Sequence, residues 1–154
     1  MPFKIFAQQS SPFTLLLFAA RSTHAQAELA QQSDTVITML PSTPHVEGTF
    51  LDAPGGLLAN MKRPGVNYID CSTIDPVASK ALHGKVAAAG GFMLDAPVSG
   101  GVGGAGAGTL TFMVGGEGKV VADNKGLLMD MGTNVVHCGA AGTGEVHGFV
   151  IFGV

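Results

Sequence analysis

Apolar and polar positions along this chain follow two alternating patterns, one typical of short buried strands and one typical of helices. Residues 27–32 have the pattern of a helix end, and residues 35–40 form a nearly continuous apolar run that Pro41 stops. Continuous hydrophobicity of this kind is typical of a strand in a parallel sheet that is covered on both faces. Pro44 can begin the next helix, and residues 66–71 predict a second short strand.

The alternation continues through the rest of the chain. Asp75 followed by Pro76 predicts a helix start, because the carboxylate can accept backbone amide bonds and proline fits the first helical position. Later segments predict a strand over 109–114, a helix over 117–131, a strand over 134–138, and a turn over 139–144 before another helix. Strands that alternate with helices imply right-handed β-α-β crossovers, so the predicted fold is an α/β, doubly wound sheet.

Three short segments directly follow predicted strands: residues 39–41, 71–73 and 97–99. The carboxyl ends of parallel strands meet at one edge of a sheet, and ligands of doubly wound folds bind there. The sequence therefore predicts a binding crevice formed by these three segments.

Six glycines lie between residues 100 and 108, ahead of a β-rich run, which predicts a loop held between two extended segments. Gly101, Gly103 and Gly106 match the G-x-G-x-x-G pattern, but a pyrophosphate-binding turn needs a helix that begins inside the glycine run. Successive amides without Cβ atoms, next to the Ser99 hydroxyl, favour an anion-binding concavity for a carboxylate instead. A flexible surface loop is the alternative.

Composition adds limits to this picture. The 154 residues are enough for one domain. Because 46% of them are hydrophobic and only 12% are charged, the chain could have apolar surface that a partner segment normally covers. A net charge of −3 without a Lys/Arg cluster argues against nucleic acid or an anionic membrane as partner. No stretch reaches the ~18 apolar residues of a membrane span. Cys71 and Cys138 make no disulfide framework, and His137 beside Cys138 lacks the paired spacing of a zinc site, so no metal is expected.

Residues 1–27 differ from the rest. The segment contains Lys4 and Arg21 around an apolar stretch and no acidic residue. It could be a secretory signal, an organellar transit peptide, or sequence that is not native to the fold.

Five spaced motifs resemble the β-hydroxyacid dehydrogenase family, and 3-hydroxyisobutyrate dehydrogenase within it. They are VITMLP (36–41), IDCSTIDP (69–76), DAPVSGG (95–101), LTFMVGG (110–116) and CGxxGTG (138–144). The resemblance implies a Rossmann-like fold and the NAD-dependent oxidation of 3-hydroxyisobutyrate to methylmalonate semialdehyde in valine degradation. It also implies a homodimer or tetramer, located in mitochondria if the organism is eukaryotic and otherwise in the cytoplasm.

The resemblance assigns a role to six residues. Leu40, Pro41 and Thr73 would contact the NAD cofactor, and Ser99, Gly100 and Gly101 would bind the small 3-hydroxy acid. From the residues alone, Pro41 and Thr73 could equally end a strand and begin a turn.

Relatives differ from this chain at the catalytic positions. The family has a lysine four residues after the second glycine of the GTG turn and an asparagine four residues later, and here these positions are Gly148 and Phe152. The lysine takes the hydroxyl proton, so no catalytic residue is assigned. His147 titrates in a suitable range, but neighbouring helix positions point about 100° apart, so rescue by His147 is not expected.

Relatives also begin with a β-α-β unit that carries the glycine turn for the cofactor, and they end in a helical domain. The expected fold is therefore an incomplete doubly wound parallel sheet that lacks both parts. We divide the chain into residues 1–27, non-homologous or targeting-like, residues 28–144, a partial NAD-binding domain, and residues 145–154, a divergent tail. A truncated gene product is the corresponding hypothesis, with weak or no NAD binding.

Two functions follow from the sequence. One is a 3-hydroxyisobutyrate dehydrogenase by descent, or a related tartronate, succinic or glyoxylate semialdehyde reductase. The other is a non-catalytic fragment that binds a ligand weakly or pairs with a full-length homologue.

Overall fold

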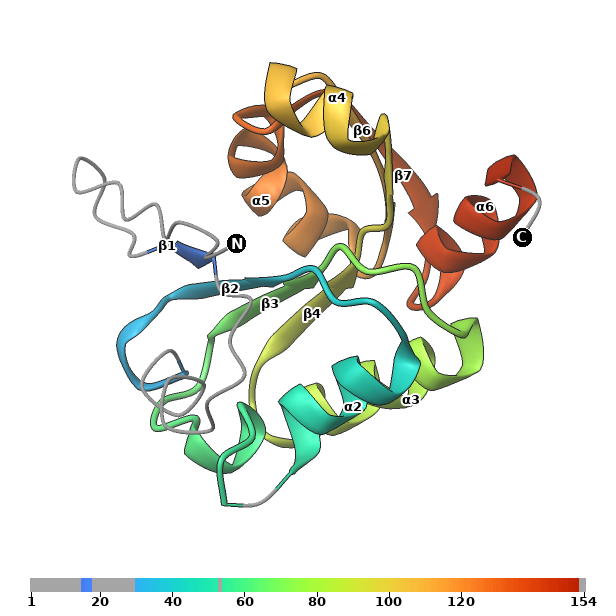
Figure 1. The fold of residues 1–154 in the computed structure, drawn as a ribbon. Helices are drawn as coiled ribbons and strands as arrows, with labels where there is room; N and C mark the ends of the chain where they lie inside the picture. Colours follow the sequence, from blue (N-terminus) through green and yellow to red (C-terminus); the bar gives the residue numbers. More distant parts are fainter. Residues whose placement is uncertain (1–14, 18–29, 53, 153–154) are drawn as a thin grey trace.

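The computed structural model describes residues 15–17, 30–52 and 54–152, and these form a seven-stranded sheet with helices around it (Figure 1). The strands are β1 (Leu15–Leu17), β2 (Thr35–Thr38), β3 (Asn67–Asp70), β4 (Phe92–Asp95), β5 (Val98–Ser99), β6 (Leu110–Gly115) and β7 (Gly132–Gly139). The helices are α2 (Thr43–Leu51), the short 3-10 helix η1 (Leu58–Asn60), α3 (Pro76–Ala88), α4 (Gly101–Ala107), α5 (Gly118–Met129) and α6 (Thr143–Phe152). The strand order is β1-β2-β3-β4-β6-β5, and β7 pairs with β6.

Strands β1 to β4 are parallel to one another, and their register places the last residues of three strands side by side. Thr38 pairs with Asp70, and Asp70 pairs with Asp95. The ladder continues beyond these ends, because the Cys71 amide donates to Thr38 O (2.7 Å) and the Ala96 amide to Asp70 O (2.7 Å). The segments after β2, β3 and β4 therefore begin at one edge of the sheet, as the sequence predicts.

The sheet is covered on both faces. Alternate strand residues enter two different apolar clusters, because side chains along a strand point to opposite faces. Val36, Tyr68 and Met93 pack with residues of α2 and α3, whereas their neighbours Ile37, Ile69 and Leu94 pack with residues of α5. Figure 1 shows α2 and α3 on one side of β2–β4 and α5 on the other. This arrangement confirms the predicted α/β, doubly wound class.

The prediction of a loop in the glycine run is wrong. Residues 101–107 form the helix α4, which Gly108 ends in the left-handed conformation (φ +66°). Glycine has a low helix propensity, which is why the sequence favours a loop. The helix connects β5 to β6, which run antiparallel, and the Thr109 amide closes its end by donating to Gly104 O (2.9 Å).

The last strands also depart from the predicted series of parallel crossovers. Strand β6 is antiparallel to β4, which it meets at the pair Asp95 and Gly115, while β7 is parallel to β6. The sheet is thus parallel in β1–β4 and mixed beyond. Residues 100–109, which contain α4, connect β5 to β6. This connection is shorter than the roughly twelve residues that a crossover between parallel strands needs.

Most helix and strand predictions are confirmed within one to three residues. Helix α3 begins at Pro76, and the Asp75 carboxylate accepts a hydrogen bond from the Ala78 amide (2.8 Å), as expected for a capping residue. Residues 30–32 are helical, whereas residues 27–29 lie outside the described residues. Of the segment 1–27, the structure describes only β1, which pairs with β2. Among the described residues, no helix has the length and apolar character needed to cross a membrane.

Candidate ligand-binding edge of the sheet

A buried carboxylate, Asp70 at the end of β3, organises the centre of this edge. Its Oδ1 accepts hydrogen bonds from Thr38 Oγ1 (2.8 Å), from the Ser72 amide (3.2 Å) and from Ser72 Oγ (2.6 Å). Burial raises the pKa of Asp70, and these hydrogen bonds lower it again in part. The Ser72 hydroxyl in turn accepts from the Leu40 amide (2.8 Å). The segments that follow β2 and β3 are therefore tied together by side chains.

This network brings the three predicted cofactor residues to the same edge. Leu40 is half-buried, and Pro41 and Thr73 are exposed just beyond it. Neither exposed residue belongs to the apolar clusters of the core. Their positions leave them accessible to a ligand, although the geometry by itself assigns them no role.

The three predicted substrate residues lie at the start of α4. Ser99 is half-buried in β5, where it pairs with Thr111. Gly100 and Gly101 are exposed and have φ values of +129° and +58°, which favour glycine. Although a helix does begin inside this glycine run, the flanking strands β5 and β6 are antiparallel. The G-x-G-x-x-G match is therefore not a dinucleotide-binding turn, which joins parallel strands.

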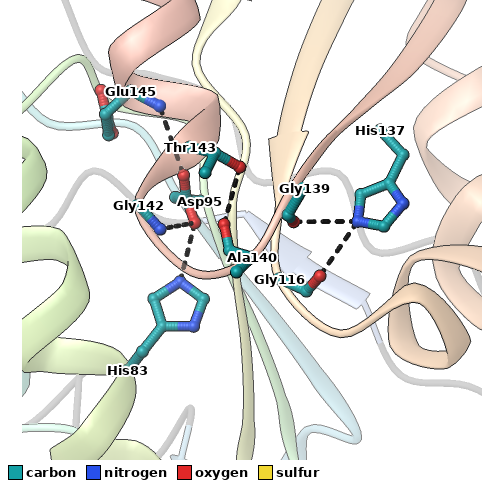
Figure 2. Close-up of polar contacts among 9 residues, drawn as sticks. All are labelled: His83, Asp95, Gly116, His137, Gly139, Ala140, Gly142, Thr143 and Glu145. Atoms are coloured by element: carbon teal, nitrogen blue, oxygen red, sulfur yellow. Dashed lines mark hydrogen bonds and ion pairs between the residues drawn. The ribbon is translucent and has the colours of Figure 1, made fainter.

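A second buried carboxylate, Asp95 at the end of β4, fixes the start of α6 (Figure 2). Asp95 is 0% exposed. Its Oδ1 accepts from the Gly142 amide (2.8 Å) and lies 2.9 Å from His83 Nε2, and its Oδ2 accepts from the Glu145 amide (3.3 Å). The carboxylate thus satisfies amides at a helix N-terminus that have no partner within the helix. It therefore acts as a cap supplied from the sheet.

Close backbone approach explains two glycines around this cap. A Cβ atom at Gly144 would lie 2.4 Å from Met113 O, and one at Gly115 would lie 2.5 Å from Asp95 Oδ2. Any larger residue would push α6 away from β4 and β6. Gly144, the last glycine of the CGxxGTG motif, is thus required for the helix to reach Asp95.

A third buried acid, Glu145, lies in the first turn of α6 and reaches the β3–α3 segment. Its Oε2 accepts a hydrogen bond from the Ile74 amide (3.1 Å), 71 positions away in sequence. Burial raises the pKa of Glu145 to about 8; the Ile74 hydrogen bond opposes the increase, and the nearby Asp70 and Asp95 carboxylates add to it. Burial also raises the pKa of the neighbouring Cys71 thiol, which disfavours a reactive thiolate there.

Position 148, where the family resemblance predicts a lysine, faces this edge. Gly148 is buried, and a Cβ atom there would lie 3.3 Å from Pro97 Cγ, in the segment that leads to Ser99. His147 is exposed instead, with Nδ1 2.8 Å from Thr143 O. The two residues lie on different faces of α6, as helix geometry predicts. Phe152 is the last residue of α6, one helical turn beyond Gly148.

Sequence reasoning missed the acids Asp70 and Glu145 and the histidine His83 that pairs with Asp95. Of these, Asp70 carries a signal in the sequence. Asp70 ends an otherwise apolar strand, and a charged residue is rarely buried without partners. Among residues 15–17, 30–52 and 54–152, the structure contains no cluster of His, Cys, Asp and Glu suited to a metal ion.

Comparisons with known proteins agree with this geometry. Residues 4–139 match the family model described as the NAD binding domain of 6-phosphogluconate dehydrogenase. That match begins inside the segment 1–27, and the domain boundaries that we drew remain a prediction.

Two curated relatives and one solved structure illustrate the similarity. The chain is 44% identical over 138 residues to an NAD-dependent L-serine dehydrogenase of Pseudomonas aeruginosa, which covers 90% of this chain and 46% of the relative. It is 50% identical over 119 residues to the mitochondrial 3-hydroxyisobutyrate dehydrogenase of Mus musculus, covering 77% and 35%. The structure of Mycobacterium tuberculosis 3-hydroxyisobutyrate dehydrogenase with L-serine superposes with a TM-score of 0.75 at 39% identity, covering 81% and 41%.

The chain therefore spans less than half the length of each of these relatives. NAD is the cofactor of the family. The parallel strands, their aligned carboxyl ends and the family match lead to one conclusion: this chain belongs to the β-hydroxyacid dehydrogenases of the 3-hydroxyisobutyrate dehydrogenase type, over the part that corresponds to their NAD-binding domain.

Proposed function

We propose that this chain carries one half of an NAD and 3-hydroxy acid site, and that it binds both ligands without oxidising the acid. The observation that carries the proposal is the register of Thr38, Asp70 and Asp95. This register starts the segments that carry the two groups of predicted ligand residues at one edge of the sheet, and Gly148 of α6 lies beside Pro97 in the segment that leads to Ser99.

The residues after β2 and β3 fit the nicotinamide end of NAD. Leu40 offers an apolar surface whose backbone amide is already satisfied by Ser72, and the exposed Pro41 and Thr73 flank it. NAD, when bound, supplies the acceptor for a hydride. We expect weak binding, because the G-x-G-x-x-G match at residues 101–106 lies between the antiparallel strands β5 and β6 and does not form a pyrophosphate-binding turn.

The residues that begin α4 fit the substrate. The Ser99 hydroxyl and the open backbone at Gly100 and Gly101 suit a small carboxylate. 3-Hydroxyisobutyrate and L-serine are both carboxylic acids with a hydroxyl on the third carbon, and both are named among the relatives and neighbours. We take 3-hydroxyisobutyrate, an intermediate of valine degradation, as the first candidate and L-serine as the second. A mitochondrial location follows if the organism is eukaryotic.

The absence of a proton acceptor at position 148 supports a non-catalytic chain. Oxidation of the hydroxyl group requires a base within hydrogen-bond reach of its proton. Glycine has no side chain, and His147 is exposed on another face of α6. A ligand-bound chain of this kind can still pair with a full-length homologue, and we propose that its role is binding or pairing.

A titration and an assay test the proposal together. Fluorescence of NADH is followed on addition of the chain, with and without 3-hydroxyisobutyrate or L-serine, and NADH formation from NAD is followed in parallel. The variants are Thr73→Ala and Ser99→Ala, and the matched control is Thr133→Ala, exposed on β7.

We expect binding without turnover. Thr73→Ala should weaken NADH binding and Ser99→Ala the binding of the acid, each by about five- to tenfold, as for a lost hydrogen bond. Thr133→Ala should change neither. Turnover above a no-enzyme control would refute the non-catalytic reading, and a failure of the chain to bind NADH would refute the ligand-binding role.

A further inference from the structure

Glu145 joins three segments that are far apart in sequence. Its side chain is 0% exposed, its Oε2 accepts from the Ile74 amide of the β3–α3 segment, and its own amide donates to Asp95 of β4. Ile74 follows Thr73 directly. The side chain that accepts from the Ile74 amide is therefore carried by α6, the helix that also carries position 148.

The other carboxyl oxygen of Glu145 is unusual. Glu145 Oε1 is buried and has no hydrogen-bond partner among the described residues. The same holds for Asp70 Oδ2. A buried ionised carboxylate without compensating hydrogen bonds is strongly destabilised, and such a group takes up a proton instead.

The charged and titratable groups around Glu145 disfavour ionisation on balance. The carboxyl groups of Asp70 on β3 and Asp95 on β4 act on it, and burial together with them raises its pKa to about 8. Cys71 lies close enough for Glu145 to raise the pKa of its thiol. Two residues of α3 with basic side chains also lie near the start of α6. His83 Nε2 contacts Asp95 Oδ1, and the Cβ atom of Lys80 lies close to Gly142.

We propose that Glu145 is a positioning residue that, in its protonated form, holds the Thr73 segment against α6 and releases this segment when the proton is lost. Ionisation places a second or third negative charge among buried carboxyl groups, and the simplest relief is hydration of Glu145 through opening of the segment that covers it. Thr73 moves with Ile74. The structural part of this inference stands alone, while its effect on cofactor affinity rests on the ligand-binding role proposed above.

Two measurements test the inference from pH 6.5 to 9. The first is the hydrogen-exchange protection factor of the Ile74 amide, which does not depend on ligand binding, and the second is the affinity for NADH. The variants are Glu145→Gln, which keeps an acceptor for Ile74 and carries no charge, and Glu145→Ala, which removes the acceptor. Glu117→Gln, at an exposed acid before α5, is the matched control.

In the wild-type chain, the protection factor of Ile74 should fall by about tenfold per pH unit from pH 6.5 to the pKa of about 8 and level off above it, and the affinity for NADH should fall over the same range. Glu145→Gln should show no change of either value with pH over this range, a result that a merely structural role would not give. Glu145→Ala should lose Ile74 protection at every pH, and Glu117→Gln should follow the wild type.

The outcomes separate the two proposals. If Ile74 protection in the wild type is independent of pH, or falls equally in Glu145→Gln, the positioning role is wrong. If the wild type does not bind NADH at any pH, the ligand-binding role is wrong, and Ile74 protection still decides the positioning role. Should Glu145→Ala not fold, the comparison of the wild type with Glu145→Gln is sufficient.

Discussion

The two sides of the candidate edge are built in opposite ways. On the side proposed for the cofactor, the segments after β2 and β3 are held by the buried hydrogen bonds of Asp70 with Thr38 and Ser72. On the side proposed for the substrate, α4 has no buried residue, and its Val102 is 92% exposed. One side is fixed by buried polar side chains, and on the other side α4 itself buries none of its residues.

This difference indicates where the edge can adapt. A buried network in which most groups are satisfied is rigid, because opening it leaves several polar groups without partners. A short helix that contains four glycines has little intrinsic stability, since each glycine costs about 1 kcal/mol relative to alanine. We therefore expect ligands to find the β2–β3 side preformed and the α4 side adjustable.

The largest expected effect breaks the rigid side. Asp70→Ala removes the acceptor for Thr38 Oγ1, the Ser72 amide and Ser72 Oγ, and leaves these buried donors unpaired. The free energy of unfolding should fall by about 3 kcal/mol. Denaturant unfolding followed by circular dichroism measures the loss.

A matched control is Asp34→Ala, because the Asp34 carboxylate pairs with a residue that is distant in sequence, Arg63, at the surface of the protein. Its ion pair with Arg63 is solvent-exposed on both sides, so we expect a loss below about 1 kcal/mol. Equal losses in the two variants would mean that the Asp70 network does not fix this side of the edge.

The next effect concerns pH and comes from Glu145, which lies between the two sides. The pKa of this residue is about 8 in the folded chain and 4.5 as its ordinary value. Between these values the folded chain holds a proton that the unfolded chain has lost, so stability falls as pH rises. The free energy of unfolding should decrease by about 1.4 kcal/mol per pH unit through this window and level off above pH 8.

Thermal unfolding at intervals from pH 5.5 to 9 checks the direction. The variant Glu145→Gln carries no titrating group at this position and should remove most of the slope. A melting temperature of the wild type that rises over this window would show that the Glu145 carboxyl ionises readily in the folded chain.

The sequence predicts the rigid side better than the adjustable one, for physical reasons. Continuous apolar runs before Pro41 and Cys71 identify two buried parallel strands, and Asp75 with Pro76 identifies a helix start, since these signals are local. Helix α4 contains four glycines, so its local signal favours a loop, and the antiparallel pairing of β5 with β6 that flanks it is tertiary and leaves no local signal. The hydrogen bond from Ile74 to Glu145 is equally invisible, because it joins residues 71 positions apart.

The smallest effect sharpens the comparison at α4. A Cβ atom at Gly103 would meet nothing within 4 Å, and the residue has no left-handed φ, so Gly103→Ala should stabilise the helix. The gain is about 0.5–1 kcal/mol, which corresponds to about two- to fivefold slower hydrogen exchange within α4. Gly108→Ala is the control, because Gly108 ends the helix with φ +66° and alanine is strained there.

Amide hydrogen exchange in α4 is compared with amide hydrogen exchange at Cys71, whose amide donates to Thr38 O on the rigid side. The comparison decides whether α4 opens independently. If α4 opens by itself, Gly103→Ala slows exchange in α4 and leaves Cys71 unchanged, and Gly108→Ala has the opposite effect on α4 alone. If both sites respond together, α4 opens only with the whole domain. The α4 side of the edge would then be as rigid as the side that Asp70 holds.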